Sequence, residues 1–132
     1  MAQKILIIDD DFDLVEINKA FLQKAGFQVD CAYNGQEGLQ KIRTFAPHLI
    51  ILDVMMTSVG EGFEVARKIR MDKEMGKIPI LMLSSVNREV GFRLRIGPDE
   101  DWNPVNAFID KPVDYDKLIN KVTEILNSQK ES

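Results

Sequence analysis

Short apolar runs alternate along the chain with longer segments in which apolar residues recur at helical spacing. An apolar or alternating run that ends at a turn residue or an acid is typical of a β-strand. The pattern predicts strands over Ile5–Ile8, Gln28–Ala32, Leu49–Leu52, Ile80–Leu83 and Ala107–Ile109.

The intervening segments repeat apolar residues every three or four positions, as the buried face of an amphipathic helix does. Gly26 closes the first pattern, because glycine commonly ends a helix. The segment 86–97 is weaker, because Gly91 interrupts it and Gly97-Pro98 closes it,. Four helices are predicted more strongly, each from one set of apolar residues. The sets are Leu14, Ile17, Phe21 and Ala25; Leu39, Ile42 and Ala46; Phe63, Ala66 and Ile69; and Leu118, Val122, Ile125 and Leu126.

This alternation predicts an α/β fold, with a parallel sheet and helices on both faces. The segments 5–8, 49–52 and 80–83 are apolar at every position, as in strands buried on both faces,. The other two strand segments alternate apolar and polar residues, which suits edges. We expect the strand order 2-1-3-4-5 with about five helices. One domain would span residues 1–127, followed by a polar tail at 128–132.

Composition and charge exclude several classes of protein. No apolar run approaches the roughly 20 residues of a membrane-spanning helix, and the ILII run is too short for a signal peptide,. We therefore expect a cytoplasmic protein. A net charge of −4 without a basic stripe argues against direct nucleic-acid binding,. Cys31 is the single cysteine, which excludes an intrachain disulfide and a Cys-based zinc cluster,.

Polar residues follow the predicted strands at their carboxyl ends. Asp9 and Asp10 follow the first strand, and Asp53 follows the third. Ser84 follows the fourth, and Lys111 comes soon after the fifth. Because parallel strands share one carboxyl edge, where such sheets bind ligands, we expect these residues to converge.

Acids gathered at one edge repel each other and need a compensating cation. Oxygen ligands favour Mg²⁺, Mn²⁺ or Ca²⁺ over Zn²⁺, and a metal with few carboxylates and several waters is typical of Mg²⁺ at phosphate sites. Lys111 could pair with one phosphate oxygen and Ser84 could donate to another. Such surroundings suit a carboxylate that attacks phosphorus. Asp11 is better placed to cap the first helix, although Asp13 with Glu16 could form the cap instead.

These motifs resemble a response-regulator receiver domain of two-component signalling, of the CheY-like class. The matching segments are KILIIDDD, LIILDVMM, GFEVARKIR, IPILMLSS and FIDKPVD, in the family's order between Lys4 and Leu126. The resemblance implies a flavodoxin-like three-layer sandwich and a role in phosphorelay signal transduction. It also implies that the chain is not an enzyme acting on other molecules, and promotes only its own phosphorylation and dephosphorylation.

The resemblance implies a role for each residue at the carboxyl edge. Asp53 would be the phosphoacceptor and Asp10 a direct Mg²⁺ ligand, with Mn²⁺ as an alternative metal. Asp9 would bind the metal directly or through water, and the backbone carbonyl of Met55 would be a further ligand.

Three further positions follow from the same resemblance. Ser84 and Lys111 would contact the phosphoryl group and act with Asp53 in its transfer. Ser84 and Phe108 would form the switch, in which the aromatic ring swings inward. The Lys111-Pro112 peptide bond would be cis, which aims the lysine.

The resemblance also implies protein partners. A sensor histidine kinase or a phosphotransfer protein would donate the phosphoryl group. Because the last helix is expected to finish near Leu126 with no effector domain behind it, a stand-alone receiver would signal by contact with an unknown target protein. No nucleic acid and no membrane insertion are expected.

Two loops depart from the family's pattern. The loop DVMMTSVGEGFE has Thr57 where receivers usually carry proline, and it is slightly longer. The chain between Ser84 and Lys111 is also long, and the excess lies in RIGPDEDWNPVNAF. Trp102 in that stretch either folds over the edge of the core or anchors a partner.

Two positions that set reaction rates in receivers are apolar here, namely Met55 and Val86. Neither side chain can orient a water by hydrogen bonding, so we expect slow autodephosphorylation. Two other functions were weighed. One is a receiver-like binding module that works without phosphorylation, which the unusual loops leave open but the intact set Asp9, Asp10, Asp53, Ser84 and Lys111 disfavours. The other is a flavodoxin-like cofactor binder, which DDDFD disfavours, because a cofactor phosphate would meet acids there.

Overall fold

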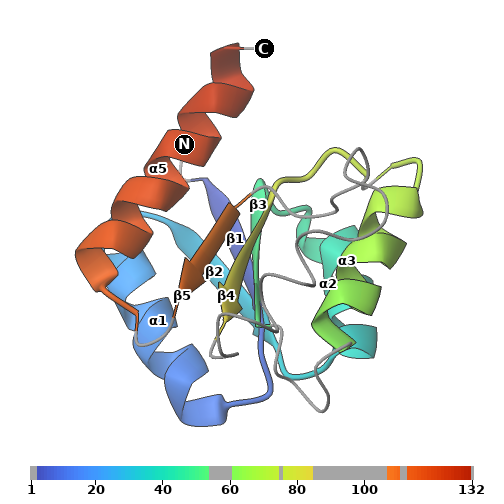
Figure 1. The fold of residues 1–132 in the computed structure, drawn as a ribbon, viewed down its shortest axis with the longest axis horizontal. Coiled ribbons are helices and arrows are strands. Elements are labelled where there is room, and N and C mark those ends of the chain that lie inside the picture. The colour runs from blue at the N-terminus through green and yellow to red at the C-terminus, as the bar shows by residue number, and fades with distance from the viewer. Residues whose placement is uncertain (1–2, 54–60, 75, 85–106, 111–112, 132) are drawn as a thin grey trace.

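The computed structural model describes residues 3–53, 61–74, 76–84, 107–110 and 113–131 (Figure 1). Strands and helices alternate along these residues. The strands are β1 (Lys4–Ile8), β2 (Gln28–Ala32), β3 (Leu49–Asp53), β4 (Ile80–Ser84) and β5 (Ala107–Asp110). The helices within the described residues are α1 (Phe12–Lys24), α2 (Gly35–Phe45), α3 (Glu61–Met71) and α5 (Tyr115–Glu131).

The strands form one parallel sheet in the order β2-β1-β3-β4-β5, which confirms the predicted order. The three central strands are the ones whose segments are apolar at every position, and their apolar side chains are all buried. Strands β2 and β5 lie at the edges, as their alternating patterns predicted.

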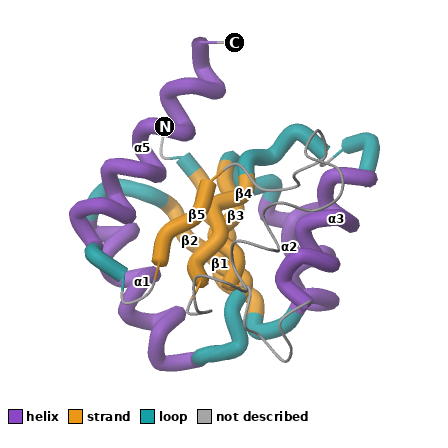
Figure 2. The backbone as a smooth tube through the Cα atoms, in the orientation of Figure 1, coloured by secondary structure: helices purple, strands orange, loops and turns teal. Residues whose placement is uncertain are grey.

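Helices cover both faces of the sheet, with α1 and α5 on one side and α2 and α3 on the other (Figures 1 and 2). Alternate residues of β1 face these two layers. Leu6 and Ile8 pack in a cluster with Ile42 of α2, whereas Ile5 and Ile7 pack in the cluster on the α1 and α5 side. This division explains why the central strands need apolar residues at every position.

The predicted buried face of α1 is wrong. Ile17 and Phe21 are 46% and 42% exposed, and the buried side chains are instead Val15, Asn18 and Leu22. The apolar pattern misled because the buried stripe contains a polar residue, while two large apolar side chains lie outside it. The cap of this helix agrees with the prediction, since Asp11 Oδ1 accepts from Leu14 N–H at 3.1 Å. Asp13 and Glu16 therefore do not form the cap.

The last helix does not finish near Leu126, as the pattern suggested, but continues to Glu131. No glycine or proline follows Leu126, and the glutamine, lysine and glutamate there are good helix formers,. Several predictions lie outside the described residues: the weak helix at 86–97, the loop after Asp53 and the loop with Trp102. Among the described helices, none is long and apolar enough to cross a membrane.

Candidate functional site

The carboxyl edge of the sheet brings several of the predicted site residues together. Ile8 pairs with Leu52, so Asp9, which follows β1, lies level with Asp53 at the end of β3. On the next strand, Ser84 is one residue beyond the position that pairs with Asp53. Segments that are far apart in sequence therefore meet along one edge, as the parallel topology requires.

Asp9 and Asp53 are both buried, with exposed fractions of only 1% and 3%. The backbone N–H of Asp9 donates to the carbonyl oxygen of Ala32 at 3.0 Å, which extends the ladder between β1 and β2 by one residue. Asp9 Oδ1 accepts from the Asp11 N–H, also at 3.0 Å. The Asp9 carboxylate is thus held in place by its own loop. Two buried carboxylates on neighbouring strands require compensating positive charge, from a cationic side chain, a bound cation or both.

The three consecutive acids after β1 have separate environments. Asp9 is buried at the edge of the sheet, Asp10 is exposed, and Asp11 caps α1. The hydrogen bonds that Asp9 and Asp11 accept from backbone N–H groups offset part of their mutual repulsion,.

The described residues contain no group of three or more His, Cys, Asp or Glu side chains arranged to hold a metal ion. Mg²⁺, however, usually keeps several waters and binds proteins through one or two carboxylates. The buried pair Asp9 and Asp53 fits that habit in donor chemistry, since both supply hard oxygen ligands. Met55, the other predicted ligand, lies outside the described residues.

The remaining predicted residues lie on the two strands beyond β3. Ser84 is the last residue of β4 and pairs with Asp110, the last residue of β5. Phe108 lies in β5 and pairs with Met82. Lys111 follows Asp110 directly in the sequence, but the lysine and the predicted cis bond to Pro112 lie outside the described residues. Val86, the apolar residue expected to slow dephosphorylation, lies outside them as well.

Two aromatic pairs that the sequence did not reveal connect elements that are distant in sequence. The ring of Phe12, at the start of α1, stacks on Tyr33 after β2, with ring centroids 5.0 Å apart. The ring of Phe21 stacks on Tyr115, the first residue of α5, at 3.9 Å. Phe12 is the one apolar residue in DDDFD. An apolar side chain among acids was the only indication in the sequence that Phe12 contacts another ring.

Tyr33 also contacts the sulfur of Cys31, with Oη 3.2 Å from Sγ. This hydrogen bond, followed by burial, raises the pKa of Tyr33 to about 12. A tyrosine is protonated at physiological pH even without this shift, so the raised pKa only widens the pH range over which a neutral ring stacks on Phe12,. Cys31 itself is buried and packs in the cluster on the α1 and α5 side, as a small apolar residue does,.

Comparison with solved structures shows the same architecture in other proteins. A response regulator receiver domain protein (CheY-like) from Methanospirillum hungatei JF-1 has 26% identity and a TM-score of 0.83, and the match covers 99% of this chain and 98% of that chain. The chemotaxis response regulator CheY4 of Vibrio cholerae has 26% identity and a TM-score of 0.76, with 95% and 99% covered.

A longer protein contains the same unit. NtrX from Brucella abortus matches 98% of this chain with 25% identity and a TM-score of 0.80, but the match covers only 27% of the NtrX chain. Residues 5–123 match the family model described as the response regulator receiver domain. The chain therefore belongs to the response regulator receiver domain family, whose members serve two-component phosphorelay signalling.

Proposed function

We propose that the chain is a Mg²⁺-dependent phosphoacceptor that takes a phosphoryl group from a sensor histidine kinase or a phosphotransfer protein onto Asp53. The observation that carries the proposal is the burial of Asp53 beside Asp9 at the carboxyl edge of the sheet. Receiver domains interact with such phosphoryl donors as a family. A buried acid at this edge is in the right place for a nucleophile that must be shielded from water.

In the proposed reaction, a carboxylate oxygen of Asp53 attacks the phosphorus of a phosphohistidine on the donor. The bond from phosphorus to the imidazole nitrogen breaks, and its electron pair stays on the leaving imidazole. Asp9 and Asp53, with the exposed Asp10, would hold Mg²⁺, which when bound supplies positive charge to the phosphoryl oxygens.

The residues on the outer strands complete the proposal. Lys111, attached just beyond Asp110, would pair with a phosphoryl oxygen, and Ser84 would donate a hydrogen bond to another. The register supports this arrangement, because Ser84 and Asp110 are paired neighbours. Phe108 and Ser84 would then report phosphorylation to the surface as the switch pair.

The chain would then be a signalling protein that catalyses only its own phosphorylation and dephosphorylation. It would act in the cytoplasm, where ATP-dependent kinases work, and would pass its signal on by protein–protein contact. The competing function is binding without phosphorylation, for which no phosphoryl group should be added to the chain.

The experiment is intact-mass measurement after incubation with acetyl phosphate and Mg²⁺. Wild-type protein should gain one phosphoryl group, and Asp53→Asn should gain none, because an amide is not a nucleophile for phosphorus. Asp13→Asn is the matched control, since Asp13 is an exposed acid in the first turn of α1 and should leave the adduct unchanged. An undiminished adduct on Asp53→Asn, or no adduct on the wild type, would contradict the proposal and favour a phosphorylation-independent module.

A further inference from the structure

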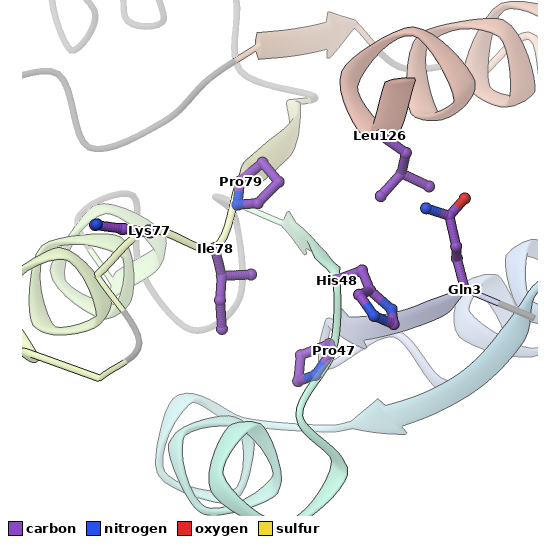
Figure 3. Close-up of a pocket in the computed structure, with 7 residues that line it drawn as sticks. All are labelled: Gln3, Pro47, His48, Lys77, Ile78, Pro79 and Leu126. Atoms are coloured by element: carbon purple, nitrogen blue, oxygen red, sulfur yellow. The ribbon is translucent and has the colours of Figure 1, made fainter. Parts of the chain in front are cut away.

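A cavity of about 360 Å³ lies at the opposite end of the sheet from the candidate site. Pro47 and His48 precede β3, Ile78 and Pro79 precede β4, and Leu126 comes from α5 (Figure 3). The two strands that begin at this cavity end at the carboxyl edge, so the cavity is separate from the phosphoacceptor site. Its volume falls in the range of about 300–1,000 Å³ that is typical of small-molecule sites.

Most of the cavity wall is apolar and fixed in place. Pro47 and Pro79 are buried, and Leu126 is only 2% exposed. The carbonyl oxygen of Pro79 accepts from the Ile50 N–H at 2.9 Å, which ties this wall to the central sheet. A preformed apolar wall favours the apolar body of a ligand, because little has to be ordered when it binds.

His48 presents a hydrogen-bond donor whose identity is set by the backbone. The backbone N–H of Lys4 donates to Nδ1 of the His48 ring at 2.9 Å. In return, the backbone N–H of His48 donates to the Lys4 carbonyl oxygen at 2.8 Å. Because Nδ1 acts as an acceptor, the neutral ring carries its proton on Nε2. His48 is exposed, and no described residue accepts a hydrogen bond from Nε2, so this donor is available to a ligand.

Two more polar side chains line the cavity. The carboxamide of Gln3 points toward Leu126, and the ammonium of Lys77 extends outward from the apolar wall (Figure 3). Lys77 is exposed and forms no ion pair within the part of the chain that the structure describes. The described residues that line the cavity include no acid. The balance of charge at the mouth is therefore positive, in a chain whose net charge is −4.

We propose that this cavity binds a small molecule with an apolar body and one carboxylate. The apolar wall would cover the body of the ligand. The His48 Nε2–H would donate to the carboxylate, with the Gln3 amide as a second donor. Lys77 would attract the anion through its charge, since its long stem lets the ammonium turn toward the mouth. A neutral analogue would bind more weakly, because it lacks the charge that attracts Lys77 and strengthens the hydrogen bond from His48 Nε2–H.

The test is titration of the ¹⁵N-labelled full chain with benzoate and with benzamide, its neutral isostere, followed by amide chemical shifts. Benzoate should give saturable shifts at His48, Lys77 and Ile78 by about 10 mM, and benzamide should bind about tenfold more weakly. Equal binding of the two probes would overturn the proposal. So would the absence of saturable shifts at these amides, or shifts confined to the carboxyl edge.

Three variants sharpen the test. His48→Asn keeps an acceptor oxygen near the position of Nδ1 for the Lys4 N–H but removes the Nε2–H donor, so it should weaken benzoate binding about tenfold. Lys77→Gln removes an exposed charge and should weaken binding about threefold without affecting folding. Lys73→Gln is the matched control, because Lys73 is also exposed but does not line the cavity, and it should bind as the wild type does. Unchanged affinity in both His48→Asn and Lys77→Gln would overturn the proposal.

Discussion

At the scale of single residues, Asn18 is the least expected member of the core. It is fully buried in α1 between Val15 and Leu22, and neither its Oδ1 nor its Nδ2 has a hydrogen-bond partner among the described residues. A buried amide without partners costs free energy that an apolar side chain of the same shape would not. Leucine has the same branching at Cγ, so it can take the place of the amide.

Asn18→Leu should therefore raise the free energy of unfolding by about 1–2 kcal/mol. The measurement is urea unfolding followed by circular dichroism. Asn120→Leu, at an exposed position of α5, is the matched control and should change stability by less than about 0.5 kcal/mol,. A loss of stability in Asn18→Leu would show instead that the amide is hydrogen-bonded in solution, for example through ordered water.

At the scale of elements, the approach of α2 to β1 depends on Gly38. A Cβ at this position would lie 2.6 Å from Ile8 Cδ1 and 2.9 Å from Ile8 Cγ1, which is closer than real atoms pack. Ile8 precedes Asp9, so a displaced strand end would also disturb the carboxyl edge. Leu39 and Ile42 of the same helix also pack in the cluster that contains Ile8.

Gly38→Ala should lower the free energy of unfolding by about 1 kcal/mol. The added methyl group overpacks the contact with Ile8, which costs about 1–3 kcal/mol. The higher helix propensity of alanine offsets about 1 kcal/mol of this cost. Thermal unfolding checks this value, and Gln36→Ala on the exposed face of the same helix is the control. Ile8→Val removes Cδ1, the nearest of the clashing atoms, so Gly38→Ala should cost less in the Ile8→Val background than in the wild type,. An equal cost in the two backgrounds would mean that contact with Ile8 Cδ1 is not the cause.

The helix faces also show what sequence patterns can and cannot predict at this scale. Ala66 and Ile69 of α3 and Leu118 of α5 are buried as predicted, because those helices bury uniformly apolar stripes. The face of α1 was mispredicted, because Phe21 is held outside the core by its stack on Tyr115. Spacing alone does not identify a tertiary contact between two aromatic residues.

At the scale of the whole molecule, the strand order was predictable because burial on both faces leaves a chemical signature. The central strands are apolar at every position and the edge strands alternate, which is sufficient to order them,. The position of Asp9 and Asp53 at one edge followed from the same argument. Lys111 and the two loops that depart from the family's pattern lie outside the described residues, so their predictions stay untested.

The proposed Mg²⁺ site at the carboxyl edge predicts that the ion stabilises the whole fold. An ion that binds the folded chain, and not the unfolded chain, stabilises it by mass action. Mg²⁺ at about ten times its Kd should therefore raise the free energy of unfolding by about 1.4 kcal/mol, or the Tm by about 5 °C. Asp9→Asn and Asp53→Asn should each lose most of this rise, because each removes a carboxylate that is buried at the site.

Calorimetry of the wild type and these variants, with Mg²⁺ and with chelator, measures the difference directly. Asp116→Asn is the matched control, because Asp116 is an exposed acid in the first turn of α5 and should keep the full response. An equal rise of Tm in all four proteins would place the ion elsewhere on the acidic surface. A response lost only in the Asp9 and Asp53 variants would locate the binding of Mg²⁺ at the edge where β1 and β3 end, independently of any phosphoryl transfer.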